Sequence, residues 1–447
     1  MIIQFKDREN ELKEIGEVLN SNKFELFVIY GRRRIGKTEL ILKATEKRKR
    51  IYYLAVGEKN LERFYAVCTK SFPEVAKLKE DWEVLFEFLK NKVDVIIIDE
   101  FQNLIKEDKN ILNIFQAIID LTLKDSKLKL ILVGSSVSMI TSNVLDYKSP
   151  LYGRRTASME LKGVRFFDLK RFFPKASMKQ LIEIYGFADG IPFYLTRIDK
   201  DFWSWLEEEI RKERSFLKDE VDFLMRYEFE DVSTYKLILE AIANGKTKLN
   251  EIKDFIKVKR TDLTPYLKNL IEVKMVKRVV PITENVKSRL GRYYLADNFL
   301  KFWFRYIYPN LSSIEEGIFD KDIVREDYDT YLGYIFEDVA KAYLIKERDK
   351  IFDFTKIGKW WYQDKEIDTI ALNEKTKEVL FCECKWKEKQ DANKIVKELA
   401  GKARSVEWHN KERKESYAVF AKSFSKKIKS FEGKRVYCFD LKDLEKG

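Results

Sequence analysis

Histidine and cysteine are almost absent from this chain of 447 residues, which has one histidine and four cysteines. His409 alone cannot complete a zinc site, and the Cys382-x-Cys384 pair is a weak metal signal by itself. Four cysteines, mostly in apolar and strand-like sequence, are also too few for the disulfide framework of a small secreted protein. We therefore expect reduced thiols in the protein core.

Proline, glycine and long apolar runs are scarce as well. Seven prolines and 17 glycines leave little material for flexible linkers, whereas 45% hydrophobic residues can supply several cores. No apolar run approaches the roughly 18 residues that a membrane-spanning helix needs, and the charged N-terminus lacks the apolar core of a signal peptide. These absences predict a cytoplasmic protein without membrane partners. The length predicts about three or four domains.

Charge, in contrast, is abundant, at 36% of residues with a formal net charge of +12. A basic excess favours an anionic partner, although a lysine-rich surface can also serve solubility alone. The preference for lysine and glutamate is typical of thermophilic proteins, because dense ion pairing costs less desolvation energy at high temperature.

An apolar strand, a glycine-rich turn and a helix-compatible run follow one another in ELFVIYGRRRIGKTELI, residues 25 to 41. The spacing is that of a Walker A loop, in which backbone N–H groups cradle phosphate oxygens at a helix N-terminus. We expect Lys37 to reach the β- and γ-phosphates and the Thr38 hydroxyl to bind Mg²⁺. The loop residues expected around ATP or ADP are Gly31, Arg32, Arg33, Arg34, Ile35, Gly36, Lys37, Thr38 and Glu39.

A second apolar strand, VDVIIIDEFQNL at residues 93 to 104, ends in Asp99 and Glu100. A continuous apolar run is typical of a parallel strand covered on both faces. We expect Asp99 to hold Mg²⁺ through water and Glu100 to orient or deprotonate the attacking water, the alternative being that Glu100 caps the next helix. After a third strand, KLKLILVGSS, Ser135 or Ser136 could sense the γ-phosphate or simply form a turn.

Six segments in this order resemble the archaeal ATPase family, in the STAND-type branch of AAA-related P-loop ATPases: FKDRENEL, GRRRIGKT, IIIDEFQNL, LVGSS, PLYGRRT and GIPFYL. The resemblance implies that Arg8 and Glu9 lie close to the adenine and that Pro192 packs on the nucleotide from a helical lid. It also makes Arg154 a candidate for completing the site, because the charge on a transferred phosphoryl group needs a cation beyond the loop lysine. The adjacent Arg155 could act instead, and a surface ion pair is an equally good explanation of Arg154.

The ATPase core is expected over residues 1–160. After it, the spacing of apolar residues along the sequence changes. Apolar positions three and four apart predict a helical lid over residues 161–228. Three short helices and a hairpin then predict a winged helix-turn-helix over residues 229–309. Within residues 246–297, 13 basic residues face 6 acidic ones, which indicates contact with DNA phosphates, although winged helices also bind proteins. The candidate phosphate contacts are Arg260, Lys268, Lys277, Arg278, Lys287, Arg289 and Arg292.

The stretch FCECKW, residues 381 to 386, carries charge within a strand-like apolar run. A period of two places Glu383 and Lys385 on one face of this strand. The segment WWYQDKEIDTIAL is expected to form one neighbouring strand that brings Asp368 beside them, and an earlier helix adds Glu337. This set fits metal-dependent phosphodiester hydrolysis. Asp368 and Glu383 would bind Mg²⁺ or Mn²⁺, Lys385 would position or activate water, and Glu337 would support a metal ligand or its water.

The arrangement of helix glutamate, aspartate and Glu-x-Lys resembles the restriction-endonuclease-like superfamily, and the resemblance assigns that fold to residues 310–447. Ile367 stands where many members have proline before the aspartate. Two alternatives remain open: a buried ion pair that includes Glu383 and Lys385, and a domain of this fold that holds DNA without cutting it.

These patterns together predict an α/β P-loop NTPase with a helical lid, a winged helix-turn-helix and a C-terminal α/β restriction-endonuclease-like domain. The expected function is ATP hydrolysis coupled to DNA binding and metal-dependent DNA cleavage. The rival prediction is a STAND-type switch, in which ATP turnover controls when proteins assemble. In that case the last domain binds partners or DNA without cleaving. Either function is compatible with an oligomer.

Overall fold

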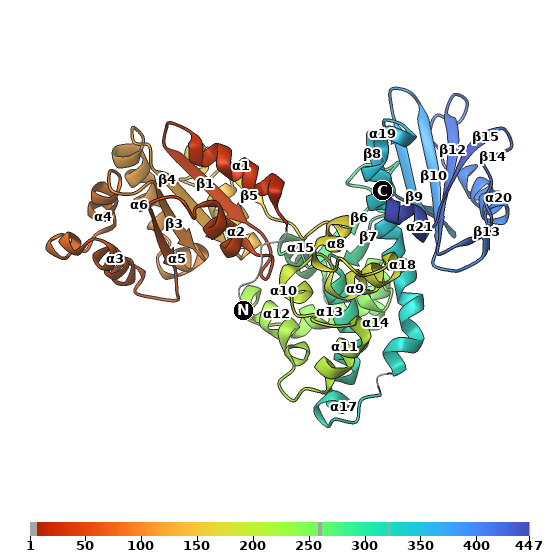
Figure 1. The fold of residues 1–447 in the computed structure, drawn as a ribbon, viewed down its shortest axis with the longest axis horizontal. Helices are drawn as coiled ribbons and strands as arrows, with labels where there is room; N and C mark the ends of the chain where they lie inside the picture. Colours follow the sequence, from red (N-terminus) through yellow and green to blue (C-terminus); the bar gives the residue numbers. More distant parts are fainter. Residues whose placement is uncertain (1–6, 258–261, 321, 447) are drawn as a thin grey trace.

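The computed structural model describes residues 7–257, 262–320 and 322–446. A parallel sheet forms the N-terminal part, a mixed sheet forms the C-terminal part, and a mainly helical region lies between them (Figure 1). Within the described ranges, no helix combines the length and the apolar character that crossing a bilayer requires.

The N-terminal sheet has five parallel strands in the order β2–β3–β4–β1–β5. The predicted apolar strands are buried because helices cover both faces of the sheet, with a separate apolar cluster on each face. The strands are β1 Glu25–Tyr30, β2 Arg50–Leu54, β3 Val95–Asp99, β4 Lys129–Gly134 and β5 Ala157–Glu160. The α-helices are α1 Glu9–Asn20, α2 Lys37–Ala44, α3 Asn60–Ser71, α4 Trp82–Leu89, α5 Gln102–Glu107, α6 Ile111–Ala117 and α7 Val137–Ile140.

The strand order positions the first candidate site. Strands β1, β4 and β3 are neighbours and run in the same direction, so their carboxyl ends meet at one edge of the sheet. The glycine-rich loop follows β1, Asp99 and Glu100 stand at the end of β3, and Ser135 follows β4. In open parallel sheets such an edge is where ligands bind.

The middle of the chain contains the helical segment expected over residues 161–228, and then the three helices and the hairpin expected before residue 297. One continuous apolar cluster joins these elements to helix α18 and strand β10 of the C-terminal part. The elements are α8 Leu169–Phe172, α9 Met178–Ala188, α10 Pro192–Leu195, α11 Phe202–Arg211, α12 Glu220–Glu228, α13 Ser233–Ala243, α14 Leu249–Phe255, α15 Thr264–Glu272, β6 Val276–Val279, β7 Arg292–Leu295, α16 Asn298–Phe302, α17 Leu311–Glu315 and α18 Asp322–Lys346.

The C-terminal sheet is mixed and has the order β14–β15–β12–β10–β9–β8. Strands β8, β9 and β10 form an antiparallel meander, and β12 and β15 continue in parallel with β10. The elements are α19 Arg348–Ile351, β8 Lys356–Tyr362, β9 Lys365–Asn373, β10 Glu378–Lys385, β11 Gln390–Asp391, α20 Ala392–Ala403, β12 Lys414–Ala421, β13 Phe424–Lys426, β14 Ser430–Phe431, β15 Lys434–Phe439 and α21 Leu441–Lys446.

One expected strand is wrong in its extent. The segment WWYQDKEIDTIAL belongs to two strands, since β8 ends at Tyr362 and β9 begins at Lys365. Gln363 has φ of 52°, in the left-handed region, and forms a two-residue turn with Asp364. The turn contains neither glycine nor asparagine, the residues that most often mark two-residue hairpin turns in a sequence. Asp368 nevertheless lies on the strand that pairs with β10, as expected.

Candidate nucleotide site and C-terminal carboxylate cluster

The loop between β1 and α2 follows a path that requires its glycines. A side chain at Gly31 would place its Cβ 2.5 Å from the carbonyl oxygen of Leu161. Gly36 has φ of 87°, a conformation that glycine adopts without steric cost. The loop thereby brings the N-terminus of α2 to the carboxyl edge of the sheet, as an anion-binding loop must.

Lys37 begins α2 and is only 5% exposed. Its Nζ donates hydrogen bonds to the carbonyl oxygens of Gly31, at 2.9 Å, and Arg32, at 3.0 Å. Burial lowers the pKa of Lys37 to about 8, against the attraction of Glu100 and Asp99. A phosphate placed in the loop would stabilise the charged form of this desolvated ammonium group.

Thr38 and Asp99 form the part of the site that suits a magnesium ion. The Thr38 hydroxyl donates to Asp99 Oδ2 at 2.6 Å, and the Tyr52 hydroxyl donates to the same oxygen at 3.0 Å. Burial raises the pKa of Asp99, and both hydrogen bonds oppose that shift. A hydroxyl beside a buried carboxylate fits Mg²⁺, which takes few protein oxygens and otherwise keeps phosphate and water ligands.

Glu100 lines the same pocket from the end of β3. Its Oε1 accepts a hydrogen bond from Ser135 Oγ at 2.9 Å, and its Oε2 accepts one from the Tyr227 hydroxyl at 2.7 Å. The Gln102 side-chain amide also donates to Oε2. These hydrogen bonds go to side chains and not to the backbone of α5, so they favour a role at the pocket over a helix cap.

Two arginines of the loop are fixed by carboxylates from later in the chain. Arg32 forms an ion pair with Asp297, which also accepts the N-terminal N–H of Leu300 in α16. Arg34 donates from Nε and Nη2 to both oxygens of Glu220, at 3.0 and 2.9 Å. The loop is therefore bound to α12 and to the segment that follows the hairpin.

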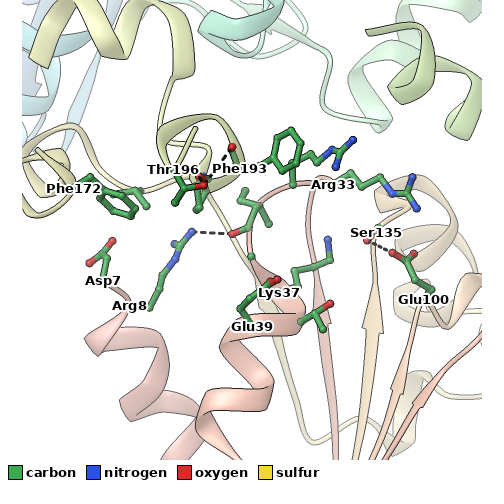
Figure 2. Close-up of a pocket in the computed structure, with 16 residues that line it drawn as sticks. Asp7, Arg8, Arg33, Lys37, Glu39, Glu100, Ser135, Phe172, Phe193 and Thr196 are labelled. Carbon is green, nitrogen blue, oxygen red and sulfur yellow. Dashed lines mark hydrogen bonds between the residues drawn. The ribbon is translucent and has the colours of Figure 1, made fainter. Parts of the chain in front are cut away.

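Arg33, the middle arginine, has a different environment. Its guanidinium carbon lies 4.1 Å from the centre of the Tyr227 ring and 4.9 Å from that of Phe223, both on α12. Figure 2 shows Arg33 extending to the side of the pocket on which Ser135 and Glu100 lie. The two rings hold this cation by cation–π attraction.

The loop, the sheet edge and the lid enclose a pocket of about 300 Å³. Figure 2 shows Lys37 near its middle, with Arg8 and Asp7 on the side opposite Ser135. Arg8 is buried and donates to the carbonyl oxygen of Ile35 at 3.4 Å. The lining residues are Asp7, Arg8, Arg33, Arg34, Ile35, Gly36, Lys37, Thr38, Glu39, Glu100, Ser135, Val164, Phe172, Pro192, Phe193 and Thr196.

A second cluster lies on the C-terminal sheet, where β9 and β10 are neighbours. Glu383 Oε1 accepts hydrogen bonds from Lys385 Nζ at 2.8 Å and from Lys402 Nζ at 2.9 Å, and Oε2 accepts from Lys402 at 3.0 Å. Asp368 Oδ2 accepts the backbone N–H of Cys384 at 2.8 Å. The structure thus brings the expected aspartate, glutamate and lysine together, and it adds Lys402 from helix α20.

Glu337 of helix α18 interacts electrostatically with Asp368 of this cluster. Burial and the nearby charge of Glu383 raise the pKa of Asp368 to about 6. Burial raises the pKa of Glu337 to about 7, and repulsion from Asp368 raises it as well. The ion pair with Lys359 acts in the opposite direction. Burial lowers the pKa of Lys385, but the hydrogen bond to Glu383 and the charge of Glu383 raise it above its ordinary value.

Asp368 and Glu383 offer carboxylate oxygens of the kind that a hard divalent cation takes, although Lys385 and Lys402 already pair with Glu383. Asp368 and Glu383 would hold the ion, which would polarise a phosphodiester and its attacking water. Among the described residues, no three or more histidine, cysteine, aspartate or glutamate side chains are grouped as a ready metal-ligand set.

Comparisons with known proteins agree with the first site. A family model described as an ATPase domain predominantly from Archaea matches residues 5–198, and one for archaeal and bacterial proteins of unknown function matches residues 303–395. An uncharacterized protein of Methanocaldococcus jannaschii is 54% identical over 445 residues, which is 98% of this chain and 100% of that protein. The chain belongs to the same family as this Methanocaldococcus jannaschii protein, and its residues 5–198 form an archaeal-type ATPase domain. An uncharacterized ATP-binding protein of the same organism is 46% identical over 48 residues, 11% of the chain and 81% of that protein.

A solved structure supports the fold. The Walker-type ATPase of Pyrococcus abyssi aligns with a TM-score of 0.53 at 22% identity, covering 67% of this chain and 96% of its own. The chain therefore has the parallel α/β P-loop ATPase fold, followed by a C-terminal domain with a mixed sheet. The expected archaeal ATPase domain and its P-loop core are confirmed.

Some residues expected at the nucleotide lie outside this pocket. Glu9 pairs with Arg171 at the surface. Arg154 donates from Nε and Nη2 to both oxygens of Asp120, at 2.8 and 2.6 Å, and the Arg155 guanidinium lies over the Tyr152 ring. These side chains stay predictions as nucleotide contacts. Pro192 does line the pocket, where its Cγ would lie 3.9 Å from a Cβ added at Gly36.

The candidate phosphate contacts of the hairpin region divide into exposed and engaged side chains. Arg278 donates to the carbonyl oxygens of Val286, at 2.8 Å, and Ser288, at 2.5 Å. Arg292 pairs with Glu366 of β9 at 2.9 Å. Arg260 lies outside the described residues. The exposed members of the set are Lys268, Lys277, Lys287 and Arg289.

Sequence reasoning missed the partners that arrive from distant elements. Tyr227, Glu220 and Asp297 reach the loop, and Lys402 reaches Glu383, although none belongs to a recognisable motif. The sequence indicated these partners only indirectly. Three successive arginines in a buried loop need carboxylates or aromatic rings as contacts, but the sequence does not say which ones.

Proposed function

We propose that this protein binds and hydrolyses ATP at the carboxyl edge of the parallel sheet. The observation that carries the proposal is that Lys37, Thr38 and Glu100 line one pocket, with Asp99 behind Thr38 as the acceptor of its hydroxyl. Backbone N–H groups and Lys37 would bind the phosphates, and Thr38 and Asp99 would hold Mg²⁺. Glu100 would take a proton from the water that attacks the γ-phosphorus.

The other pocket residues have roles that follow from their position. Arg8 would contact the nucleoside, since it lies on the side of the pocket away from Glu100 (Figure 2). Pro192 would pack on the nucleotide from the lid, and Glu9 would act at the rim. Arg32 and Arg34 would shape the loop through their carboxylate partners.

The ATPase proposal is tested with Lys37→Ala and Glu100→Gln. Lys37→Ala should lose ATP binding and turnover together. Glu100→Gln should retain binding and lose at least about 100-fold in kcat, because the amide cannot accept the proton. The measurements are calorimetric ATP binding and phosphate release, and normal turnover in Lys37→Ala would refute the assignment of the site.

We propose further that nucleotide state controls a DNA-directed C-terminal domain. In this proposal the region of α13–α15 and the β6–β7 hairpin acts as a winged helix-turn-helix, and Lys268, Lys277, Lys287 and Arg289 bind DNA phosphates. The mixed sheet acts as a restriction-endonuclease-like domain, whose order of helix, antiparallel meander, helix and parallel strand supports that interpretation. Asp368, Glu383 and Lys385 would then cut DNA with Mg²⁺ or Mn²⁺, supported by Glu337.

Cleavage is tested by nicking of supercoiled DNA with and without ATP. Glu383→Ala should abolish Mg²⁺- or Mn²⁺-dependent nicking and leave ATP turnover unchanged. Glu398→Gln, an exposed glutamate of α20, is the matched control and should behave as wild type. Nicking that persists unchanged in Glu383→Ala would come from another site or from a contaminant.

A STAND-type switch without cleavage is the second candidate function. The observation in its favour is that Lys385 and Lys402 together satisfy both oxygens of Glu383, so the cluster is compatible with a structural ion pair. A switch should bind no Mn²⁺ at this cluster and should change its assembly state with ATP, which calorimetry and sedimentation measure.

A further inference from the structure

The three successive arginines of the loop differ in what holds them. Arg32 and Arg34 are each neutralised by a carboxylate, from Asp297 and Glu220. Within the part of the chain that the structure describes, Arg33 forms no ion pair, and the rings of Phe223 and Tyr227 are what hold its guanidinium. Of the three, Arg33 is the cation whose charge is not already neutralised.

A guanidinium held by ring faces keeps its N–H groups available. Cation–π attraction acts through the plane of the ring, whereas the five N–H donors point outward in the plane of the guanidinium. Such a group can hydrogen-bond two oxygens of an anion without first giving up a carboxylate. Arg33 is half-buried, so this capacity is open to a ligand of the pocket.

The position of Arg33 indicates which part of the ligand it meets. Arg33 lines the pocket together with Lys37, Glu100 and Ser135, and Figure 2 shows it on their side and away from Arg8 and Asp7. That side is where the proposed base stands. Arg154 instead has its Nε and Nη2 on Asp120 and does not line the pocket.

We infer that Arg33 is the catalytic arginine of ATP hydrolysis, supplied by the phosphate loop itself. The inference rests on the proposed ATPase function. The water oxygen forms a bond to the γ-phosphorus while the bond from that phosphorus to the β–γ bridging oxygen breaks. ADP keeps the electron pair, the proton of water passes to Glu100 and then to solvent, and Arg33 stabilises the charge on the γ-phosphoryl oxygens.

Helix α12 gives this arginine a connection to the rest of the molecule. Tyr227 carries the ring beneath Arg33, and its hydroxyl donates to Glu100 at 2.7 Å. The same side chain therefore positions both the cation and the base, and α13 begins only a few residues after α12 ends. A shift of α12 would therefore change the contacts of Tyr227 with Arg33 and with Glu100 at the same time.

The experiment compares Arg33→Met with Arg154→Met in the full-length protein. Methionine retains contact with the aromatic rings and removes only the charge and the donors. Arg33→Met should lower kcat by about 10²–10³-fold with the Kd for ATP changed less than about fivefold. It should also fail to trap ADP with aluminium fluoride, which mimics the transferred phosphoryl group, whereas Arg154→Met should match wild type in all three measurements.

Three results would overturn the inference. The first is a kcat within threefold of wild type in Arg33→Met; the second is a loss of ATP affinity as large as the loss of kcat; the third is failure of trapping in Arg154→Met instead. If Arg33→Met does not fold, Arg33→Lys provides the same test, because lysine keeps the charge and lacks the forked N–H donors, and it should lower both kcat and trapping at retained ATP affinity. Wild-type protein that binds no ATP would refute the ATPase proposal itself, an outcome distinct from these.

Discussion

The protonation of Lys37 is expected to depend on whether ATP is bound. Burial brings its pKa down to about 8 from the ordinary 10.5, so about half of the molecules carry a neutral Lys37 at pH 8. Phosphate oxygens favour the ammonium form and must raise this pKa again when ATP binds. ATP binding and protonation of Lys37 are therefore linked.

The linkage predicts proton uptake on ATP binding. At pH 8 the protein should take up about half a proton, and above pH 9 the Kd should rise by close to tenfold per pH unit. Calorimetry in two buffers of different ionisation enthalpy measures the uptake. Glu46→Gln, which changes an exposed carboxylate that pairs with Lys43 outside the pocket, should keep the uptake, whereas an uptake of zero in wild type would mean that Lys37 stays charged without ATP.

Substitution of Lys402 can separate metal binding at the C-terminal cluster from DNA nicking. It bonds both oxygens of Glu383, and its positive charge also opposes a cation at that carboxylate. Lys402→Met should therefore bind Mn²⁺ about tenfold more tightly and yet nick DNA about tenfold more slowly, because Glu383 loses the bonds that orient it.

The opposite signs of these two effects make the Lys402 test specific. Mn²⁺ affinity comes from calorimetry and nicking from the supercoiled-plasmid assay. Lys397→Met, an exposed lysine of the same helix, should change neither quantity. A purely structural Lys402 would weaken both metal binding and nicking and lower the melting temperature.

At the scale of elements, α12 is the helix that holds the phosphate loop and the sheet edge together. Glu220 binds Arg34, the rings of Phe223 and Tyr227 hold Arg33, and Glu228 accepts the Ser136 hydroxyl at 2.9 Å. Glu220 is buried and also accepts the Tyr194 hydroxyl at 3.0 Å. Its ion pair is therefore costly to break, because a buried charge would remain unpaired.

Glu220→Gln should destabilise the contact between lid and loop. We expect a loss of about 2–3 kcal/mol in the free energy of unfolding, less than for a fully buried pair because Arg34 is 29% exposed, together with a raised KM for ATP. Chemical denaturation and steady-state kinetics measure the two effects. Glu208→Gln removes an exposed lid carboxylate that pairs with Lys200 and should change neither; equal effects of both variants would contradict the argument.

The elements themselves were largely predictable, because each has a local signature. The apolar runs of β1, β3 and β4 and the glycine spacing of the loop predicted the nucleotide edge, and period-two alternation placed Glu383 and Lys385 on β10. The turn at Gln363 was missed, although four successive polar residues, Gln363 to Glu366, separate Tyr362 from Ile367 and mark a break in the apolar pattern. Pairings such as Arg32 with Asp297 depend on how α16 packs against the loop, which no local pattern encodes.

At the scale of the whole molecule, the β6–β7 hairpin region touches both candidate sites. Asp297, just after β7, pairs with Arg32 of the phosphate loop. At the other end, the N–H of Ile282 donates to the carbonyl oxygen of Lys359 at 2.9 Å, and Trp361 Nε1 donates to that of Leu290 at 3.0 Å. Lys359 in turn pairs with Glu337 of the C-terminal cluster. Figure 1 shows the hairpin between the lid helices and β8.

This contact path predicts where coupling between ATP and DNA can be cut. Arg292 of β7 pairs with Glu366 of β9 at 2.9 Å and lies 4.6 Å from the centre of the Trp361 ring, so it fastens the hairpin to the sheet. Glu366→Gln should leave basal ATP turnover unchanged and shrink the ATP-induced change in DNA affinity by at least about threefold, within the usual 1–3 kcal/mol of allosteric coupling. Binding titrations of duplex DNA with and without ATP measure the change.

The control for this prediction is Glu374→Gln, which removes a half-exposed carboxylate of the turn between β9 and β10, away from the hairpin. It should retain the full ATP effect on DNA affinity. Spatial contact alone does not establish coupling, because both sites must bias the same element. If Glu366→Gln keeps the full ATP effect, the hairpin is only a spacer, and the shared apolar core that joins the lid to α18 becomes the path along which nucleotide state reaches the C-terminal cluster.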